Sequence, residues 1–209
     1  MGILSSEEIL DRLKLDIGDP QSLAITPLLL KKEAFSTDSI DLRLGSHFLL
    51  PQVPPRPFIA LDEDTMQGAN LRVHVPFGKY LVVPAHHTVL GSTLEFIKLP
   101  ADVAAQILTK SSIARTFVVI ETAPWVHPSY RGCLTLEIAN VSNTPLLIHP
   151  GLKIGQLILQ TVDLREKPKA DQKLTGSYLG PVYPESPKFG SVRDALKSIG
   201  IRDAELPGH

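Results

Sequence analysis

The stretch "GCLTLEIAN" at residues 132–140 decides the fold, because apolar and polar residues alternate in it as they do in a β-strand with one buried face. One side of such a strand carries Leu134, Leu136 and Ile138. The other side carries Glu137, together with Thr135 and Ala139. A glutamate there is either a solvent-facing group on a half-buried strand or a general acid/base that lines a pocket. The alternation alone favours the first reading and does not separate the two.

Similar short runs extend outward from this strand in both directions. They are broken by many of the 18 prolines and 14 glycines, which leave little room for long helices. The predicted strands lie within residues 38–50, 71–75, 79–84, 87–100, 103–108, 117–123, 145–151 and 153–162. This pattern predicts an all-β sandwich or barrel. Before it, "SSEEILDRL" at 5–13 predicts a short helix capped by Ser5 or Ser6.

Composition limits the function classes. The chain has 209 residues, is 43% hydrophobic and carries a formal net charge of -1, which fits one soluble domain without a broad nucleic-acid footprint. The single cysteine, Cys133, rules out an internal disulfide and favours a reducing compartment. The N-terminal stretch "MGILSSEEILDRL" lacks the basic region and apolar run that predict a secretory signal, and no apolar run approaches the ~18 residues of a membrane span. We therefore expect a cytoplasmic protein with no nucleic-acid and no membrane partner.

The segment "TKSSIAR" at 109–115 is short, basic and rich in hydroxyl groups. Lys110 and Arg115 supply charged donors suited to phosphate, and Ser111 and Ser112 supply neutral ones. The alternative is a capped helical turn with solvated charges, which composition alone favours. Zinc chemistry is not expected, because zinc-dependent base deaminases need an H-x-E motif and a Cys-x-x-Cys pair, and the chain has neither.

Taken in order, these stretches resemble the dCTP deaminase branch of the dUTPase-like superfamily. The resemblance covers "DSIDLRLGSHF" at 38–48, "VLGSTLEFIKLPADVAAQILTKSSIAR" at 89–115, the region 122–159 and, more faintly, "GSYLGPVYPESPKF" at 176–189. Within the family the chain is most similar to bacterial bifunctional enzymes, which carry dCTP through to dUMP. The run "LTLEIANVSNTPLLIHPGLKIGQL" at 134–157 has that character.

The resemblance implies a mainly β subunit, a distorted β-barrel of jelly-roll type with a short N-terminal helix, assembled as a homotrimer. It divides the chain into a barrel core at 1–165 and a C-terminal lid or tail at 166–209. Each active site of the family lies at a subunit interface. The substrate is a pyrimidine deoxynucleoside triphosphate accompanied by Mg²⁺, and the family deaminates without zinc.

The family's motifs assign the site residues. Glu137 is implied as the catalytic proton shuttle, and Ser111 as the residue that orients water. The residues implied to bind substrate are Lys110, Ser112, Ile113, Ala114, Arg115, His127, Thr135, Leu136 and Gln156. Lys169, Ser177 and Tyr178 are candidates for the lid. At position 127 relatives keep an acid near the sugar, whereas His127 is a ring that can donate or accept a hydrogen bond.

The resemblance therefore implies hydrolytic deamination of dCTP to dUTP, with or without further cleavage to dUMP and diphosphate. Two alternatives stay open. One is a dUTPase-like hydrolase that acts on a deoxyuridine or modified pyrimidine triphosphate. The other is a non-catalytic nucleotide-binding trimer. Glu137 with Ser111 favours the deaminase, whereas the absence of the family's tail lysine and glutamine at the aligned positions favours the alternatives.

Overall fold

The computed structural model describes residues 2–28, 38–52, 70–121, 123–163, 180–188 and 197–200. These residues are mainly β with a short N-terminal helix, which confirms the predicted class. The described residues include the helices α1 (Ser6–Lys14) and α3 (Ser111–Ala114). The strands are β1 (Ala24–Thr26), β2 (Ile40–Arg43), β3 (His47–Pro51), β4 (Asn70–His74), β5 (Leu81–Val83), β6 (Thr88–Lys98), β7 (Val103–Thr109), β8 (Val118–Ile120), β9 (Trp125–Val126), β10 (Arg131–Asn140), β11 (Leu146–Ile148) and β12 (Lys153–Thr161).

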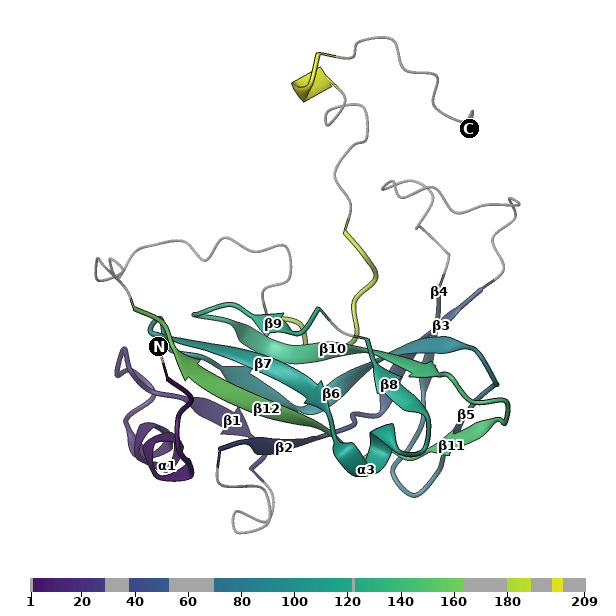
Figure 1. Cartoon of the computed structure of the whole chain (residues 1–209), viewed down its shortest axis with the longest axis horizontal. Coiled ribbons are helices and arrows are strands. Elements are labelled where there is room, and N and C mark those ends of the chain that lie inside the picture. The colour runs from purple at the N-terminus through teal and green to yellow at the C-terminus, as the bar shows by residue number, and fades with distance from the viewer. Residues whose placement is uncertain are drawn as a thin grey trace.

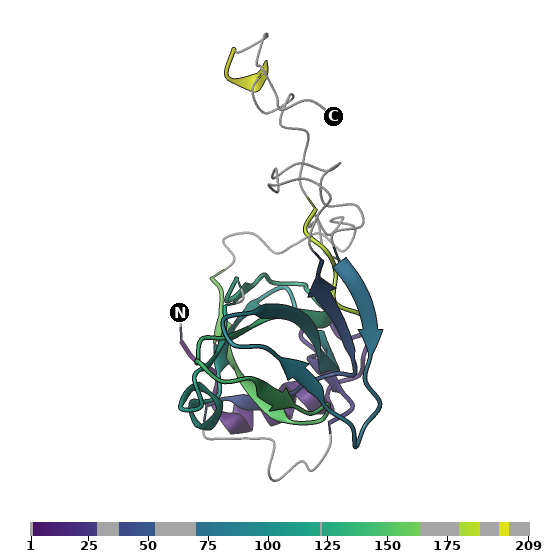
Figure 2. The same ribbon diagram turned by 90° about the vertical axis from the view of Figure 1, so that its right-hand side faces the viewer.

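Two antiparallel sheets enclose the core. One has the strand order β4-β3-β6-β10-β8, with β1 also paired to β6, and the other has the order β2-β12-β7-β9. Figure 1 shows them as two layers, and Figure 2 shows the strands curling around a common interior. A separate two-stranded ribbon, β5 with β11, extends from one end. No helix among the described residues is long and apolar enough to span a lipid bilayer.

The core lies between the two sheets, where apolar side chains from both layers meet. Both sheets contribute side chains that are at most 1% exposed: Ile40, Leu42, Phe48, Leu136, Ile138 and Leu157. Complete burial of such a side chain stabilises the fold by roughly 1.5–3 kcal/mol. The apolar face predicted for residues 132–140 is therefore confirmed as core, with Thr135 and Glu137 on the half-buried opposite face.

The stretch at 38–50 differs from the prediction of one strand. It forms β2, which pairs with β12, and β3, which pairs with β6 and β4 in the other sheet. The chain changes sheets at Gly45, whose backbone N–H donates to the carbonyl of Ser92 at 2.7 Å. A Cβ at this position would lie 3.0 Å from that carbonyl oxygen, so a side chain there would force the two segments apart. The alternation of apolar and polar residues continues through Gly45, but the strands with which the chain pairs change there.

Helix α1 begins at Ser5, one of the two caps that the sequence allows. Ser5 Oγ accepts a hydrogen bond from the Glu8 backbone N–H at 3.3 Å, and the Glu8 carboxylate accepts one from the Ser5 N–H at 2.7 Å. This capping box satisfies two backbone donors at the helix start. Arg12 then joins Asp102 through two bonds of 3.0 and 2.6 Å, which fastens the helix to the turn between β6 and β7.

Residues 180–188 lie on the barrel, along β10. The Gly180 N–H donates to the Arg131 carbonyl and the Cys133 N–H donates to the Pro181 carbonyl, both at 2.7 Å. Gly132 has a φ of +148°, and a Cβ there would lie 2.5 Å from Pro181, so this close approach requires glycine. Farther along, the ring centroids of Tyr183 and His47 lie 4.5 Å apart. The segment therefore returns onto the sheet that carries Glu137 (Figure 1).

Candidate active site

The segment 110–115 forms the short helix α3 between β7 and β8. Lys110 stands at its N-cap and donates its backbone N–H to the Ile154 carbonyl at 3.0 Å. The residues Ser111, Ser112, Ala114 and Arg115 are exposed, whereas Ile113 packs against the core. The two hydroxyls and the guanidinium are therefore accessible to a ligand. Among the described residues, no carboxylate forms an ion pair with Arg115.

Lys110 is held by a carboxylate that the sequence reasoning did not single out. Its Nζ atom lies 2.7 Å from Asp41 Oδ1, while Lys153 Nζ lies 3.3 Å from Asp41 Oδ2. Asp41 is only 7% exposed. Gln156 is the direct partner of Asp41 in the pairing of β12 with β2, so both side chains lie on one face. Lys110, Asp41, Lys153 and Gln156 thus form one cluster beside α3.

Glu137 lies in the middle of β10. It is half-buried, and its Oε2 atom is closed off from solvent. It is therefore not the fully solvated surface group that the alternation favoured. Thr135, on the same face, is also half-buried and accepts a hydrogen bond from the Glu185 N–H at 3.3 Å. Leu136 is completely buried in the core, so its side chain does not reach a ligand on this face.

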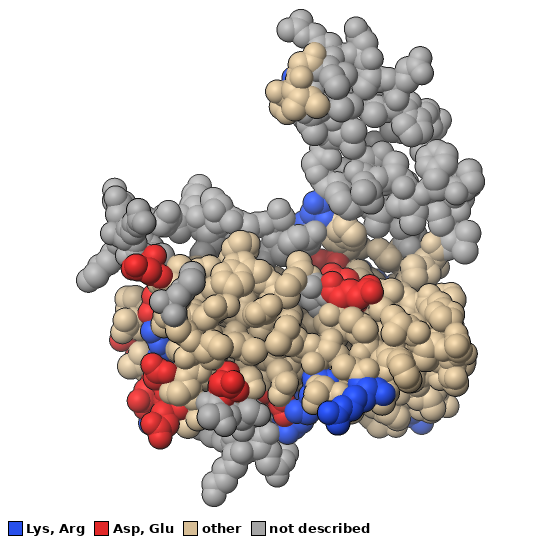
Figure 3. All heavy atoms as spheres, viewed as in Figure 1, with Lys and Arg blue, Asp and Glu red and all other residues tan. Residues whose placement is uncertain are grey.

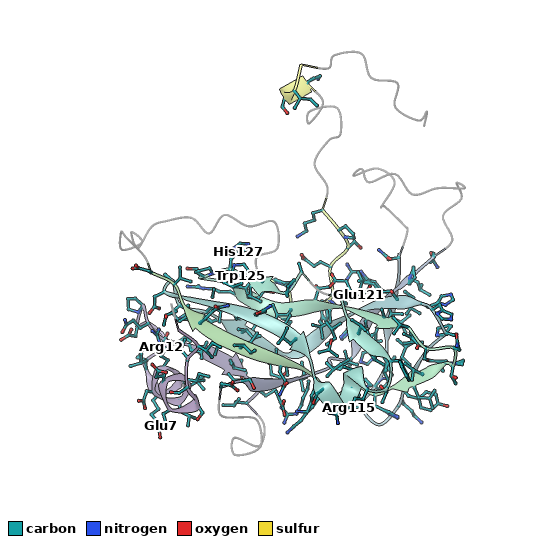
Figure 4. The ribbon with its side chains drawn as sticks, in the orientation of Figure 1. Glu7, Arg12, Arg115, Glu121, Trp125 and His127 are labelled. Atoms are coloured by element: carbon teal, nitrogen blue, oxygen red, sulfur yellow. The ribbon has the colours of Figure 1, made fainter. Side chains whose placement is uncertain are left out.

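The loop that precedes β10 adds an exposed indole and an exposed imidazole. Trp125 pairs with Gln106 through β9 and is 41% exposed. His127 is exposed as well, and its carbonyl accepts the Tyr130 N–H at 3.2 Å. The Pro124 carbonyl accepts the Ile107 N–H at 2.9 Å, which fixes the loop to β7. In Figure 4, Trp125 and His127 lie along the same side of the barrel as Glu121.

The structure does not bring the two groups of predicted site residues together within one chain. Glu121 donates its backbone N–H to the Glu137 carbonyl at 2.8 Å, so it marks the position of Glu137. Figure 4 places Glu121 on one side of the barrel and Arg115 on the opposite side. The space-filling view agrees, with basic side chains gathered over α3 and acidic ones near Glu121 (Figure 3). Within one copy, the two groups of candidate site residues therefore lie on opposite sides of the barrel.

The remaining buried ionisable groups belong to the interior. Arg43 and Glu95 form an ion pair at 3.1 Å, with side-chain exposures of 8% and 1%. Burial raises the pKa of Glu95, although its bonds to Arg43 oppose that rise. Burial also raises the pKa of Cys133, which suits an inert thiol. Within the described part of the chain, no group of three or more His, Cys, Asp or Glu side chains could hold a metal ion. Lys169, Ser177 and Tyr178 lie outside the described residues.

Comparison with known proteins agrees with this architecture. A family model described as dCTP deaminase-like matches residues 3–162. The chain belongs to the dCTP deaminase-like family. It is 30% identical over 189 residues to the "dCTP deaminase, dUMP-forming" of Methanobrevibacter smithii, covering 89% of this chain and 94% of that protein. It is 33% identical over 191 residues to the "dCTP deaminase" of Halorubrum lacusprofundi, covering 90% and 92%.

The crystal structure of 2'-deoxycytidine 5'-triphosphate deaminase from Agrobacterium tumefaciens has the same fold as this family member, with a TM-score of 0.59 and 22% sequence identity. The match covers 77% of this chain and 48% of that one, so this chain spans about half the length of the solved protein. The similarity confirms the predicted dUTPase-like architecture. Two residues of the candidate site, Asp41 and Glu121, were missed by the sequence analysis because their neighbours come from distant strands.

Proposed function

We propose that this family member deaminates dCTP by hydrolysis, with Glu137 as the general acid/base. The observation that carries the proposal is the position of Glu137 on β10, where one carboxylate oxygen is closed off from solvent. A glutamate held in this position on a strand can act as a general acid/base toward a ligand that lies against the same face. The names of the two relatives quoted above support dCTP as the substrate.

The chemistry needs one carboxylate to move protons in sequence. Glu137 takes a proton from water as the water oxygen bonds to C4 of cytosine, and it passes that proton to N3. A second proton then goes from the resulting hydroxyl to the amino nitrogen through the same carboxylate. The C4–N4 bond breaks, and ammonia and dUTP are released. Ser111 orients the water, because its hydroxyl can both donate and accept a hydrogen bond.

The complete site is proposed to form between two copies of the chain in a homotrimer. This explains why one copy carries Glu137 and Arg115 on opposite sides (Figure 4). A closed ring would bring the α3 half-site of one subunit against the β10 half-site of the next, using one repeated interface. His127 and Thr135 would contact the nucleoside from the β10 side, and Gln156 would do so from the α3 side.

The triphosphate is proposed to bind at 110–115. Arg115 and Lys110 supply charged donors, Ser112 supplies a hydroxyl, and the backbone of Ile113 and Ala114 lines the turn. Mg²⁺ would arrive with the triphosphate as part of the substrate, because phosphate oxygens are its preferred ligands. A lid built from residues 166–209, including Lys169, Ser177 and Tyr178, stays a prediction. The cytoplasmic location and the absence of nucleic-acid and membrane partners also stay predictions.

Whether the reaction continues to dUMP is a finer question, because relatives of both descriptions match the chain. The decisive experiment incubates the pure protein with dCTP, dUTP, CTP or dCMP in the presence of Mg²⁺ and identifies the products. Ammonia and dUTP from dCTP would support the deaminase, and dUMP with diphosphate would extend it. Hydrolysis of dUTP without deamination of dCTP would favour the dUTPase-like alternative, and binding without turnover would favour the non-catalytic trimer.

A further inference from the structure

Glu121 and Glu137 are direct cross-strand partners. β8 pairs with β10 in the antiparallel register Val118↔Asn140, Val119↔Ala139 and Ile120↔Ile138. One further step in the same register places Glu121 opposite Glu137. The 2.8 Å bond from the Glu121 N–H to the Glu137 carbonyl shows that the pairing does continue to this position. Because directly opposite residues of an antiparallel pair share a face, both carboxylates project from the same side of the sheet.

The pair lies where two different partners of β10 meet. Residues 180 and 181 form hydrogen bonds with the main chain of β10 near its start, at Arg131 and Cys133. The segment 117–121 forms hydrogen bonds with the main chain of residues 137–141, at the other end of β10. Glu121 is thus the residue that borders Glu137 on the side of the β8 strand. Unlike Glu137, it is exposed. Its side chain is therefore free to reach a ligand that already contacts Glu137.

Two glutamates at directly opposite positions repel each other, and such pairs destabilise a sheet. Among the described residues, no lysine, arginine or histidine forms an ion pair with Glu121. By contrast, the buried carboxylates Asp41 and Glu95 are each joined to a cation. A ligand that offers hydrogen-bond donors between Glu121 and Glu137 would relieve the repulsion, whereas one that offers acceptors would add to it.

Cytosine and uracil differ in this respect. At C4, cytosine carries an amino group, which donates, and uracil carries a carbonyl oxygen, which accepts. An ionised glutamate can only accept. We propose that Glu121 is a specificity-determining residue that accepts a hydrogen bond from the exocyclic amino group and thereby selects cytosine over uracil nucleotides. This inference rests on the proposed function, which puts the C4 edge of the base against Glu137.

The proposal has a consequence for the product. Once the amino group has left as ammonia, the uracil carbonyl faces the carboxylate of Glu121. The binding free energy of the product is therefore less favourable than that of the substrate. Free dUTP should accordingly bind more weakly than dCTP. The same unfavourable contact would help the deaminated nucleotide to leave the site.

The test measures binding in the Glu137→Gln background, where deamination does not convert dCTP into dUTP. Calorimetry with the Mg²⁺ complexes of dCTP and dUTP gives the ratio of the two affinities, and the same ratio is measured after Glu121→Gln is added. Glutamine keeps the size of the side chain and presents an amide donor to the uracil carbonyl. We expect the preference for dCTP to fall by at least about tenfold, which corresponds to ~1.4 kcal/mol.

Glu185→Gln in the same background is the matched control. It also removes one negative charge near β10, but the Glu185 side chain is turned toward Lys188, at 2.8 Å. The control should leave the ratio of affinities unchanged within about twofold. An unchanged ratio in the Glu121 variant, or an equal loss in both variants, would overturn the proposal.

The outcome also separates this inference from the proposed function. If the parent protein deaminates dCTP and Glu121→Gln keeps the base preference, the role of Glu121 is wrong and the deaminase stands. If the parent binds dCTP in preference to dUTP without deaminating it, and Glu121→Gln loses that preference, the role of Glu121 stands and the chemistry assigned to Glu137 is wrong. If the parent protein binds neither nucleotide, both are wrong.

Discussion

Lys110 Nζ lies 2.7 Å from Asp41 Oδ1, so the lysine of the proposed phosphate-binding segment is already paired within its own chain. Lys153 shares the same carboxylate at 3.3 Å. Arg115, five residues after Lys110, has no such ion pair among the described residues and is exposed. The two cations of this segment are therefore not equivalent, because one is tethered and the other is accessible.

The first prediction follows from this difference. Arg115→Ala should weaken dCTP binding by about 1.5–3 kcal/mol, the scale of a charge-assisted hydrogen bond, without changing thermal stability. Lys110→Ala should cost less affinity but should lower the melting temperature, because it leaves the buried Asp41 with fewer partners. Calorimetry with dCTP and with deoxycytidine, together with thermal unfolding, checks both. Equal affinity for the nucleoside and the triphosphate would show that the segment does not bind phosphate.

The second prediction concerns Glu137. Glu137→Gln should abolish deamination and leave dCTP affinity within about tenfold, or ~1.4 kcal/mol. The amide keeps the shape of the side chain but cannot shuttle protons. Ammonia release and nucleotide binding are measured on the same preparation. Glu7→Gln, on the exposed face of α1, is the control and should retain full turnover. Substantial turnover in the Glu137 variant would exclude it as the general acid/base.

The third prediction tests whether two subunits share a site. Glu137→Gln and Arg115→Ala should each be nearly inactive, yet mixing them under conditions that exchange subunits should restore activity. If each site takes Glu137 from one copy and Arg115 from its neighbour, random mixing of equal amounts leaves about a quarter of the sites intact. A mixture no more active than its components, in trimers proven to have exchanged, would place both residues in one subunit's site.

The fourth prediction concerns the buried pair Arg43–Glu95. Glu95→Ala should destabilise the fold by about 3–5 kcal/mol, because it leaves the guanidinium buried without its carboxylate. Replacing both partners, with Arg43→Met and Glu95→Leu, should recover most of that loss. Urea unfolding of the single and double variants measures the coupling. Additive losses in the double variant would contradict this account of the pair.

The same carboxyl group predicts a dependence on pH. Burial raises the pKa of Glu95 above its ordinary value of 4.5, so the folded state holds this proton more tightly than the unfolded chain does. The resulting contribution to stability is fully present below pH 4.5 and is lost as the pH rises through the raised value. The stability advantage of the parent over Glu95→Gln should therefore narrow as the pH increases, which unfolding at several pH values will measure.

The fifth prediction concerns the contact between His47 and Tyr183. Burial, and then the nearby charge of His74, lower the pKa of His47 below its ordinary value of 6.5. Its neutral form is therefore favoured in the folded state, and the stability that depends on it is present above pH 6.5 and lost as the pH falls through the lowered value. The protection of residues 180–188 against hydrogen exchange, relative to an unfolded chain at the same pH, should therefore fall on acidification. His47→Phe keeps the ring but cannot take up a proton, so it should remove the change.

Periodicity predicted the parts of the fold that depend on neighbours in sequence. The alternation at 132–140 identified Leu134, Leu136 and Ile138 as core, and the serines before "EEILDRL" located the start of α1. Family motifs then pointed to Glu137 and to the segment 110–115. The strand face and the helix start were predictable because strand alternation and helix capping depend on residues only two to four positions apart.

The remaining features depend on partners that are distant in sequence. The break at Gly45 is set by the approach of Ser92, and the tether on Lys110 comes from a residue 69 positions earlier. The relation of Glu121 to Glu137 is a matter of register between two strands. A shift of one residue would have put their side chains on opposite faces, and no local pattern around Glu121 specifies that register.

The close fit of Pro181 against Gly132 has a consequence for handling the protein. The bonds from residues 180 and 181 occupy the hydrogen-bonding edge of β10 at Arg131 and Cys133. An unprotected strand edge is a template on which another chain can add, and proteins protect such edges to avoid aggregation. A truncation that removes the segment, or a Gly132 substitution that displaces it, would uncover this edge in the middle of the molecule's main sheet. Such variants should lose solubility on concentration or storage before they lose their fold.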